Sequence, residues 1–422
     1  MLKKLLLIAG TFYILFYPPV FGAHSLRIIA VIAFLYLLPR VPYFKVLFNV
    51  SRLEKVYFTW SVILIWISSV IILNNSSIGS VNPFVYWLFS VIPASLMIGN
   101  EIRESNGDLF TLIDLTLYAG LLQGICSVLA FFVPSIKQFF LSQLASAEVI
   151  DLAHYGYFVD MRLYGFANGL TYAMPVLQAF LTMIAIYLAI NKNIKYLLFV
   201  PFTLFSAVVN ARTSLVVIGI CGIILLLQFK GYDSKKVGKM AFLSCGAVCL
   251  LLVGIKIVQT YSPNTYLWIA DGANQIVLFL EGKFDSGYFA YLLNADRWRF
   301  PEGVYFVFGK GLRIIGDNDS GFYTDVGYVN DVWLGGILYA VVIYSIVCSY
   351  LIKLAKAEVN DNASQNMLKY LSFSLLVASV FLNLKGYVVN LNCIANFFVV
   401  ISVYQQLTRP YDPTMNQLRG II

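Results

Sequence analysis

The clearest pattern along the chain is a repeated alternation between long apolar runs and short polar connections. The apolar runs are about 15–22 residues long, the length that a transmembrane helix needs to cross a bilayer. They predict about twelve spans, at residues 5–22, 26–38, 56–74, 84–99, 109–133, 171–190, 196–211, 213–229, 240–258, 332–352, 368–384 and 387–405. The sequence therefore predicts an all-α integral membrane protein.

Lysine and arginine are concentrated in alternate connections between these spans. They are Lys3, Lys4, Arg40, Lys45, Arg52, Lys55, Lys192, Lys195, Lys230, Lys235, Lys236, Lys239, Lys353, Lys356 and Lys369. Short cytoplasmic loops carry an excess of these residues, so this side is predicted to be cytoplasmic, together with both termini. The acidic segment 101–108 falls on the same side, but acidic residues count little in that rule. Two long segments, 134–170 and 259–331, then face outward from a single polytopic domain, 1–422.

The amino-acid composition narrows the class of protein further. Hydrophobic residues make up 60% of the chain and charged residues 12%, whereas soluble domains carry about 25% charged residues. A soluble protein is therefore not expected. The net charge of +8 is spread between apolar runs, which fits contact with anionic membrane lipid and not with nucleic acid. Segment 259–331 is net acidic and rich in tyrosine and tryptophan, and its length predicts short helices of its own.

Arginines on the outer side are the first candidates for chemistry. Arg212 lies in a tight turn between two predicted spans. A guanidinium at the bilayer centre costs about 2.5–3.5 kcal/mol, so it is retained at a membrane edge, in a polar cavity or beside an anion. The other outer arginines are Arg162, Arg297, Arg299 and Arg313. Guanidinium groups match phosphate oxygens with two parallel hydrogen bonds. The simpler interpretation is that each one reaches lipid headgroups or pairs with an acid.

The first outer segment contributes a second set of candidates. His154 lies beside Asp151 and is a candidate substrate contact, although a lone loop histidine is more often a solvated polar residue. After Arg162, the glycines Gly165 and Gly169 permit a turn that faces phosphate or sugar. The same spacing also fits close packing of two helices.

The end of the second outer segment combines glycines with carboxylates. Glycines stand in Phe308-Gly309-Lys310-Gly311 and in the pair Gly335-Gly336, and they permit tight turns. Asp325 is the candidate general base, because a carboxylate can accept a proton from a sugar hydroxyl. It can equally cap the helix that follows. Asp319 and Tyr328 are candidate substrate contacts. The acidic run around Asp319 lacks the later glutamate of a calcium loop, so no metal site is predicted.

Three features together resemble the O-antigen polymerase (Wzy-type) family, in the superfamily that it shares with O-antigen ligases. The first is the arginine in the outer turn Asn210-Ala211-Arg212-Thr213-Ser214. The second is Arg297 or Arg299 ahead of Phe308-Gly309-Lys310-Gly311. The third is Asp325-Val326-Gly327-Tyr328, followed by Gly336 at the opening of a span. The span number and the long late outer segment also fit, so the resemblance covers essentially the whole chain.

The resemblance implies a glycosyltransferase of the bacterial inner membrane with a GT-C-like architecture and a periplasmic active site. Such an enzyme transfers a growing glycan from undecaprenyl diphosphate to the terminal sugar hydroxyl of a new lipid-linked repeat unit, in lipopolysaccharide and surface polysaccharide biosynthesis. It uses neither metal nor other cofactor. The resemblance places diphosphate on Arg212 and on Arg297 or Arg299. The related ligases resemble one another in having a histidine where this chain has Asp325, which favours a polymerase.

Two alternatives stay open at this point. One is an O-antigen ligase of the same superfamily, which differs in its acceptor. The other is a lipid-linked oligosaccharide flippase or another transporter. Transporters usually carry charges near the membrane midplane inside spans, whereas the charges here are predicted to cluster outside. The predicted partners are the undecaprenyl-diphosphate-linked oligosaccharide and membrane lipid, with a chain-length regulator as a candidate protein partner and no nucleic acid.

Overall fold

A computed structural model describes the chain in several stretches separated by gaps. They are residues 2–20, 23–41, 53–146, 162–168, 172–228, 252–283, 294–314, 322–357, 361–386 and 392–407, with the single residues 238, 246 and 290. The chain divides into two compact units. Unit 1 comprises Met1–Ser25 and Asp114–Ala290, and unit 2 comprises Leu26–Ile113 and Tyr291–Ile422. Each unit therefore combines segments that are distant in sequence.

Membrane-length apolar helices dominate the described residues. Five are long and apolar enough to cross a bilayer, at Ile78–Glu104, Leu109–Phe132, Ala173–Asn191, Gly327–Ala355 and Asn362–Leu382. Four shorter apolar helices occupy Tyr57–Leu73, Ile194–Val208, Thr213–Gln228 and Cys393–Gln405. The helical membrane class is confirmed at this level. The number of twelve spans stays a prediction, partly because most of the predicted span 240–258 lies outside the described residues.

Unit 1 is built around one almost entirely buried helix. Its elements are α1 (Leu2–Phe16), β1 (Pro19–Val20), β2 (Ala23–His24), most of α7 (Leu109–Phe132), α8 (Pro134–Ser146), α10 (Ala173–Asn191), η4 (Ile194–Phe199), α11 (Val200–Val208), α12 (Thr213–Gln228) and α14 (Pro263–Leu280). The two strands pair antiparallel, with Pro19 opposite His24. Helix α10 packs against α11 and α12, and nearly all of its residues are buried.

Small and polar residues bring the helices of unit 1 together. The hydroxyls of Thr182 and Thr203 lie 2.9 Å apart, and the Gln178 side chain donates to the Gly120 carbonyl at 3.0 Å. At Gly124 an added Cβ would meet the Phe202 carbonyl oxygen at 2.7 Å, so only glycine allows this approach. Apolar packing does not drive association between helices inside lipid. Hydrogen bonds and close approaches at glycine therefore contribute more of the association energy there.

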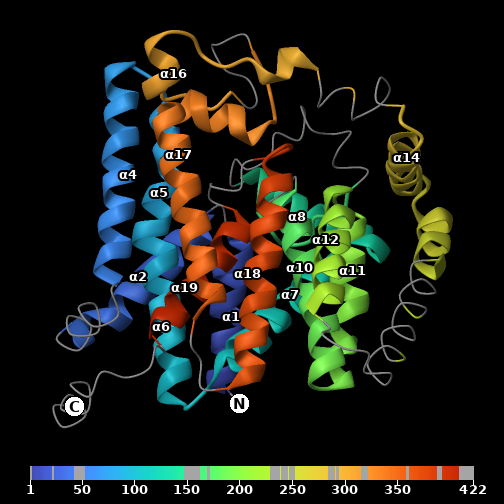
Figure 1. Ribbon diagram of the computed structural model, residues 1–422. Helices are drawn as coiled ribbons and strands as arrows, with labels where there is room; N and C mark the ends of the chain where they lie inside the picture. Colours follow the sequence, from blue (N-terminus) through green and yellow to red (C-terminus); the bar gives the residue numbers. More distant parts are fainter. Residues whose placement is uncertain are drawn as a thin grey trace. The chain divides into compact units, whose positions relative to one another are not determined.

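Unit 2 is also helical. Its elements are α2 (Ser25–Leu37), η1 (Leu38–Arg40), α4 (Leu53–Leu73), η2 (Ile78–Val81), α5 (Asn82–Tyr86), the π-helix η3 (Trp87–Val91), α6 (Ile92–Glu104), η5 (Ala295–Trp298), α16 (Val304–Phe308), α17 (Gly327–Ala355), α18 (Asn362–Leu382) and α19 (Cys393–Leu407). Helix α17 packs beside α16 and α18 (Figure 1). The predicted outer segment 259–331 thus contains α14, η5 and α16.

Helix α17 is broken at Gly336, which has φ +81° and ψ 175°. An alanine there would place its Cβ only 2.0 Å from the Val307 carbonyl oxygen. The carbonyls of residues 333, 334 and 335, just before the break, accept hydrogen bonds from groups outside the helix. The donors are the backbone N–H groups of Lys310 and Gly311, at 2.8 and 3.0 Å, and the indole of Trp66, at 3.2 Å. The carbonyl groups before the break are therefore satisfied by specific partners.

Candidate functional site

The first arginine cluster lies in unit 1, at the turn between α11 and α12. Asn210 in this turn is fully buried and forms a two-way link to Leu163. Its side-chain oxygen accepts from the Leu163 N–H at 2.8 Å, and its side-chain nitrogen donates to the Leu163 carbonyl at 2.9 Å. This link fixes the segment that carries Arg162 next to the turn that carries Arg212. Two predicted site residues 50 positions apart are thereby brought together.

Both guanidinium groups of this cluster lie over the indole ring of Trp268 in α14. The Arg162 and Arg212 guanidinium carbons are 5.4 and 5.0 Å from the ring centroid. A cation over an aromatic face gains about 0.5–1 kcal/mol at an exposed site and more where water is excluded. The indole thus attracts both cations to one residue of α14.

Arg212 is also attached to the backbone and a carboxylate of α14. Its Nη2 donates to the Trp268 carbonyl at 2.8 Å and lies 2.7 Å from an Asp271 carboxylate oxygen. Its aliphatic part runs along Gly272, where an added Cβ would meet the Arg212 side chain at 2.7 Å. The side chains of Arg212 and Asp271 keep 28% and 54% of their exposure, so a dissolved anion can compete with Asp271 for the guanidinium.

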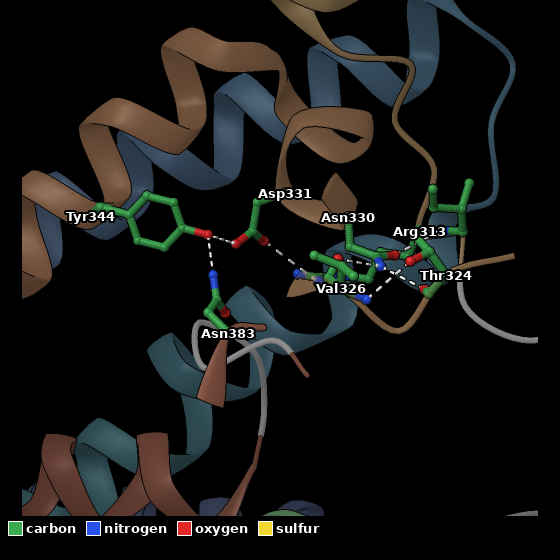
Figure 2. Close-up of polar contacts among 8 residues, drawn as sticks. Arg313, Thr324, Val326, Asn330, Asp331, Tyr344 and Asn383 are labelled. Carbon is green, nitrogen blue, oxygen red and sulfur yellow. Dashed lines mark hydrogen bonds and ion pairs between the residues drawn. The ribbon is translucent and has the colours of Figure 1, made fainter. Parts of the chain in front are cut away.

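The second cluster lies in unit 2 and joins Arg313 to a buried carboxylate (Figure 2). Asp331, in the part of α17 before the break, has no solvent exposure, and an Arg313 Nη1 lies 3.8 Å from one of its oxygens. The other oxygen accepts a hydrogen bond from the Tyr344 hydroxyl, which in turn accepts one from the Asn383 side chain. A buried carboxylate is thus oriented by two helices, α17 and α18.

The break at Gly336 is what allows Tyr344 to reach Asp331. In a straight α-helix, residues 13 positions apart lie about 20 Å apart along the axis, which is beyond the length of a tyrosine side chain. With non-helical backbone at Gly336, the two parts of α17 turn toward one another and the contact forms. A conformation that only glycine adopts easily therefore assembles this polar group.

Asn330 fixes the backbone next to Arg313. This buried side chain accepts from the Ile314 N–H at 2.9 Å and donates to the carbonyls of Thr324 and Val326 at 2.9 and 3.0 Å (Figure 2). Around it, Ile314, Val326 and Val329 form a small apolar core. The segment with Arg313 therefore runs along the first turns of α17, attached by side-chain and backbone hydrogen bonds.

The other predicted site residues of unit 2 each make local contacts of their own. Arg297 donates to the Tyr323 carbonyl at 2.7 Å and lies over the Tyr323 ring. The backbone carbonyl of Arg299 accepts from the Trp333 indole at 3.0 Å. Tyr328 packs its ring on Tyr344 and donates its hydroxyl to a carbonyl of α18.

Asp325, the candidate base, lies in the extended segment that leads into α17 and is partly buried. The residue at the cap position of α17 is Val326, and no side chain caps this helix end. His154 and Asp319 lie outside the described residues, so their placement stays a prediction.

Several residues of these clusters were not among the predicted site residues. They are Asn210, Trp268, Asp271, Asn330, Asp331, Tyr344 and Asn383. A signal existed for three of them, because Trp268, Asp271 and Asp331 belong to the aromatic and acidic content of segment 259–331. The asparagines and Tyr344 lie at helix ends or inside apolar runs, and nothing in their spacing distinguishes them.

Within the described ranges, no group of three or more His, Cys, Asp or Glu side chains is arranged to hold a metal ion. No protein-family model matches the sequence, and neither a curated protein nor a solved structure matches it. The function is therefore inferred from the two arginine clusters and their surroundings.

Proposed function

We propose that this chain is a membrane glycosyltransferase that polymerises a surface polysaccharide from undecaprenyl-diphosphate-linked repeat units. The observation that carries the proposal is the convergence of Arg162 and Arg212 on Trp268. Two guanidinium groups beside one aromatic ring, next to membrane-length helices, match the charge of a lipid diphosphate. The active site is proposed to be periplasmic, with both termini cytoplasmic.

In the proposed reaction, the terminal sugar hydroxyl of one lipid-linked repeat attacks the anomeric carbon that joins the growing glycan to its carrier. The bond from that carbon to the diphosphate oxygen breaks, and undecaprenyl diphosphate leaves with the bonding electrons. Arg212 and Arg162 stabilise the leaving diphosphate, and each charge-assisted hydrogen bond contributes about 1.5–3 kcal/mol. The hydroxyl proton passes to a carboxylate base.

The test of this function is purified full-length protein in liposomes that contain lipid-linked repeat units. A ladder of products on a gel supports a polymerase. A single transfer to lipid A core assigns the ligase alternative instead. If no sugar bond forms, either between repeat units or to lipid A core, the glycosyltransferase proposal is wrong.

The role of Asp325 has its own test. Asp325→Asn removes the proton acceptor but retains size and polarity, so turnover should fall by at least about a hundredfold, the lower end of what a positioned base contributes. Binding of lipid-linked repeats should stay near the wild-type value. An Asn variant that still makes the ladder would exclude Asp325 as the base.

A lipid-linked oligosaccharide transporter is the second candidate, and one observation favours it. Asp331 is a fully buried carboxylate in a membrane-length helix that is broken at Gly336. Broken helices and buried ionisable groups are typical of transporters. Movement of intact repeat units across the liposome bilayer without any new sugar bond would assign this function.

A further inference from the structure

The pair of Arg313 and Asp331 is expensive to bury, which raises the question of what it does. The Arg313 side chain is 12% exposed, and the Asp331 side chain is not exposed at all. Taking charges out of water costs several kcal/mol per ion, and an apolar pair of similar size is often as stable or more stable. Stability alone therefore does not account for the pair.

The geometry of the pair is also unusual for a simple salt bridge. At 3.8 Å, the closest nitrogen and oxygen are beyond the length of a good charge-assisted hydrogen bond, about 2.7–2.9 Å. Both partners are held from elsewhere: Asp331 by the Tyr344 hydroxyl, and the Arg313 backbone by the bond from Ile314 to Asn330. The surroundings, more than mutual contact, set the separation of the two charges.

The backbone on the other side of Arg313 is fixed as well. Lys310 and Gly311 donate to the carbonyls of Trp333 and Leu334 in α17. At Gly311, φ is +73° and an added Cβ would meet Ile71 at 2.9 Å, so this approach requires glycine. Arg313 therefore projects from a segment that is anchored before and after it, and only its side-chain torsions are left to be set.

We infer that Asp331 is a positioning residue that holds the Arg313 guanidinium in one orientation, and that this guanidinium binds the diphosphate group of a polyprenyl-linked substrate. A carboxylate behind a guanidinium directs its remaining N–H donors away from the carboxylate, and a fixed fork loses less entropy when it binds. The 12% exposure of Arg313 leaves a small part of the side chain accessible to such a group. This inference rests on the proposed function for its substrate class.

The experiment uses purified full-length protein in detergent and farnesyl diphosphate as the probe, with affinity measured by thermophoresis. Asp331→Asn should weaken binding about tenfold, the lower end of what one lost charge-assisted hydrogen bond produces. Arg313→Gln should weaken it by at least as much. If Asp331 acts only through Arg313, then Asp331→Asn should cause no further loss in the Arg313→Gln background. Inorganic diphosphate should compete with the probe.

The matched control is Asp361→Ala. Asp361 accepts from the N–H groups of Ala363 and Ser364 at the start of α18, at 2.7 and 3.0 Å. Its loss should destabilise unit 2 by about 1 kcal/mol, as for other helix caps. Because that residue is not part of the Arg313 cluster, affinity for farnesyl diphosphate should not change. Affinity and thermal stability measured on the same samples separate a positioning role from general destabilisation.

If Asp331→Asn does not fold, Tyr344→Phe serves in its place. It removes the hydroxyl that orients Asp331 but retains the ring, and should weaken binding about threefold. Unchanged or tighter binding in both Asp331→Asn and Tyr344→Phe would overturn the inference, because Asp331 would then act as a mere counter-ion. Failure of the wild type to bind the probe, or of inorganic diphosphate to compete, would also overturn it. The polymer ladder is scored separately, so a wild type that binds the probe but makes no polymer removes only the proposed function.

Discussion

The two arginine clusters place the same pair of charges in opposite surroundings. In unit 1, Arg212 and Asp271 are partly exposed and lie 2.7 Å apart. In unit 2, Arg313 and Asp331 are almost fully buried, yet they lie 3.8 Å apart. The exposed pair is in direct contact although Arg212 also bonds to the Trp268 carbonyl, and such a pair contributes about 0–1 kcal/mol. A buried pair is positioned by its neighbours, since every polar group there needs a partner.

This comparison teaches that the two aspartates affect anion binding in opposite directions. Asp271 should compete with an incoming anion for Arg212, because it occupies the guanidinium and its side chain is 54% exposed to water. Asp331 is fixed by Tyr344 and cannot follow or leave its arginine. Removal of the first carboxylate should therefore free an arginine, whereas removal of the second should disorder one.

The largest expected effect comes from the glycine that assembles the buried cluster. Gly336→Ala places a Cβ 2.0 Å from the Val307 oxygen at a backbone φ of +81°. The positive φ alone costs about 1–3 kcal/mol, and the clash adds to it. The yield of monodisperse protein in detergent and its unfolding temperature should both fall sharply.

Gly219→Ala is the matched control for that substitution. Gly219 lies inside α12, and an added Cβ meets nothing within 4 Å. Alanine should leave the protein unchanged or stabilise it by about 0.5–1 kcal/mol, because glycine is unfavourable within a helix. Equal behaviour of the two variants would show that the break at Gly336 is not needed.

The next effect concerns the exposed cluster. Arg212→Lys retains the positive charge but loses the planar fork, so we expect polymer formation to fall at least about tenfold, the cost of one charge-assisted hydrogen bond. Gel analysis of the products measures it. Lys256→Arg, at an exposed helix position, is the control that should leave the products unchanged. Near-normal chain length in Arg212→Lys would remove Arg212 from the site.

A smaller effect of opposite sign is expected for Asp271→Asn. The exposed pair contributes up to about 1 kcal/mol, so loss of the carboxylate should tighten farnesyl diphosphate binding by up to about fivefold. Asp331→Asn should weaken it in the same assay. Changes in the same direction for both variants would refute the contrast between the two clusters.

The smallest effect is expected for Trp268→Phe. Phenylalanine retains an aromatic face but attracts cations more weakly, so the loss should be about 0.5 kcal/mol, or roughly twofold in affinity. Trp268→Leu should have the larger effect of the two, because it removes the aromatic face altogether. Titration with farnesyl diphosphate at low and high salt checks both variants. Equal affinities for all three proteins would show that the indole does not organise the two arginines.

Apolar length predicted some elements closely. The predicted span 171–190 corresponds to α10 at Ala173–Asn191, because a helix enclosed by protein and lipid must be apolar throughout its length. The predicted span 332–352 is less accurate, since α17 begins at Gly327 and is broken at Gly336. The glycine pair indicated a special backbone conformation there, but not the direction in which the helix turns.

The candidate site was predictable only in part. Arg212 was singled out because a charge beside apolar runs is costly, and Arg162 because its segment was predicted to face outward. The structure brings these two together on Trp268. Arg313 was also singled out, but its partners were not. Tyr344 lies 13 positions after Asp331, and no straight helix would join them. Contacts that depend on a break in a helix leave no periodic signal in the sequence.

By itself, the sequence determined that this chain is a helical membrane protein. It also indicated which charged residues lie beside apolar runs, where a charge is energetically unfavourable. Both follow from one-dimensional quantities: the length of apolar runs and the expense of a charge beside them. Only the tertiary structure decided which aspartate meets which arginine, and whether each pair is open to water or enclosed. Those outcomes depend on a turn at Asn210 and a break at Gly336, where local backbone geometry brings distant residues together.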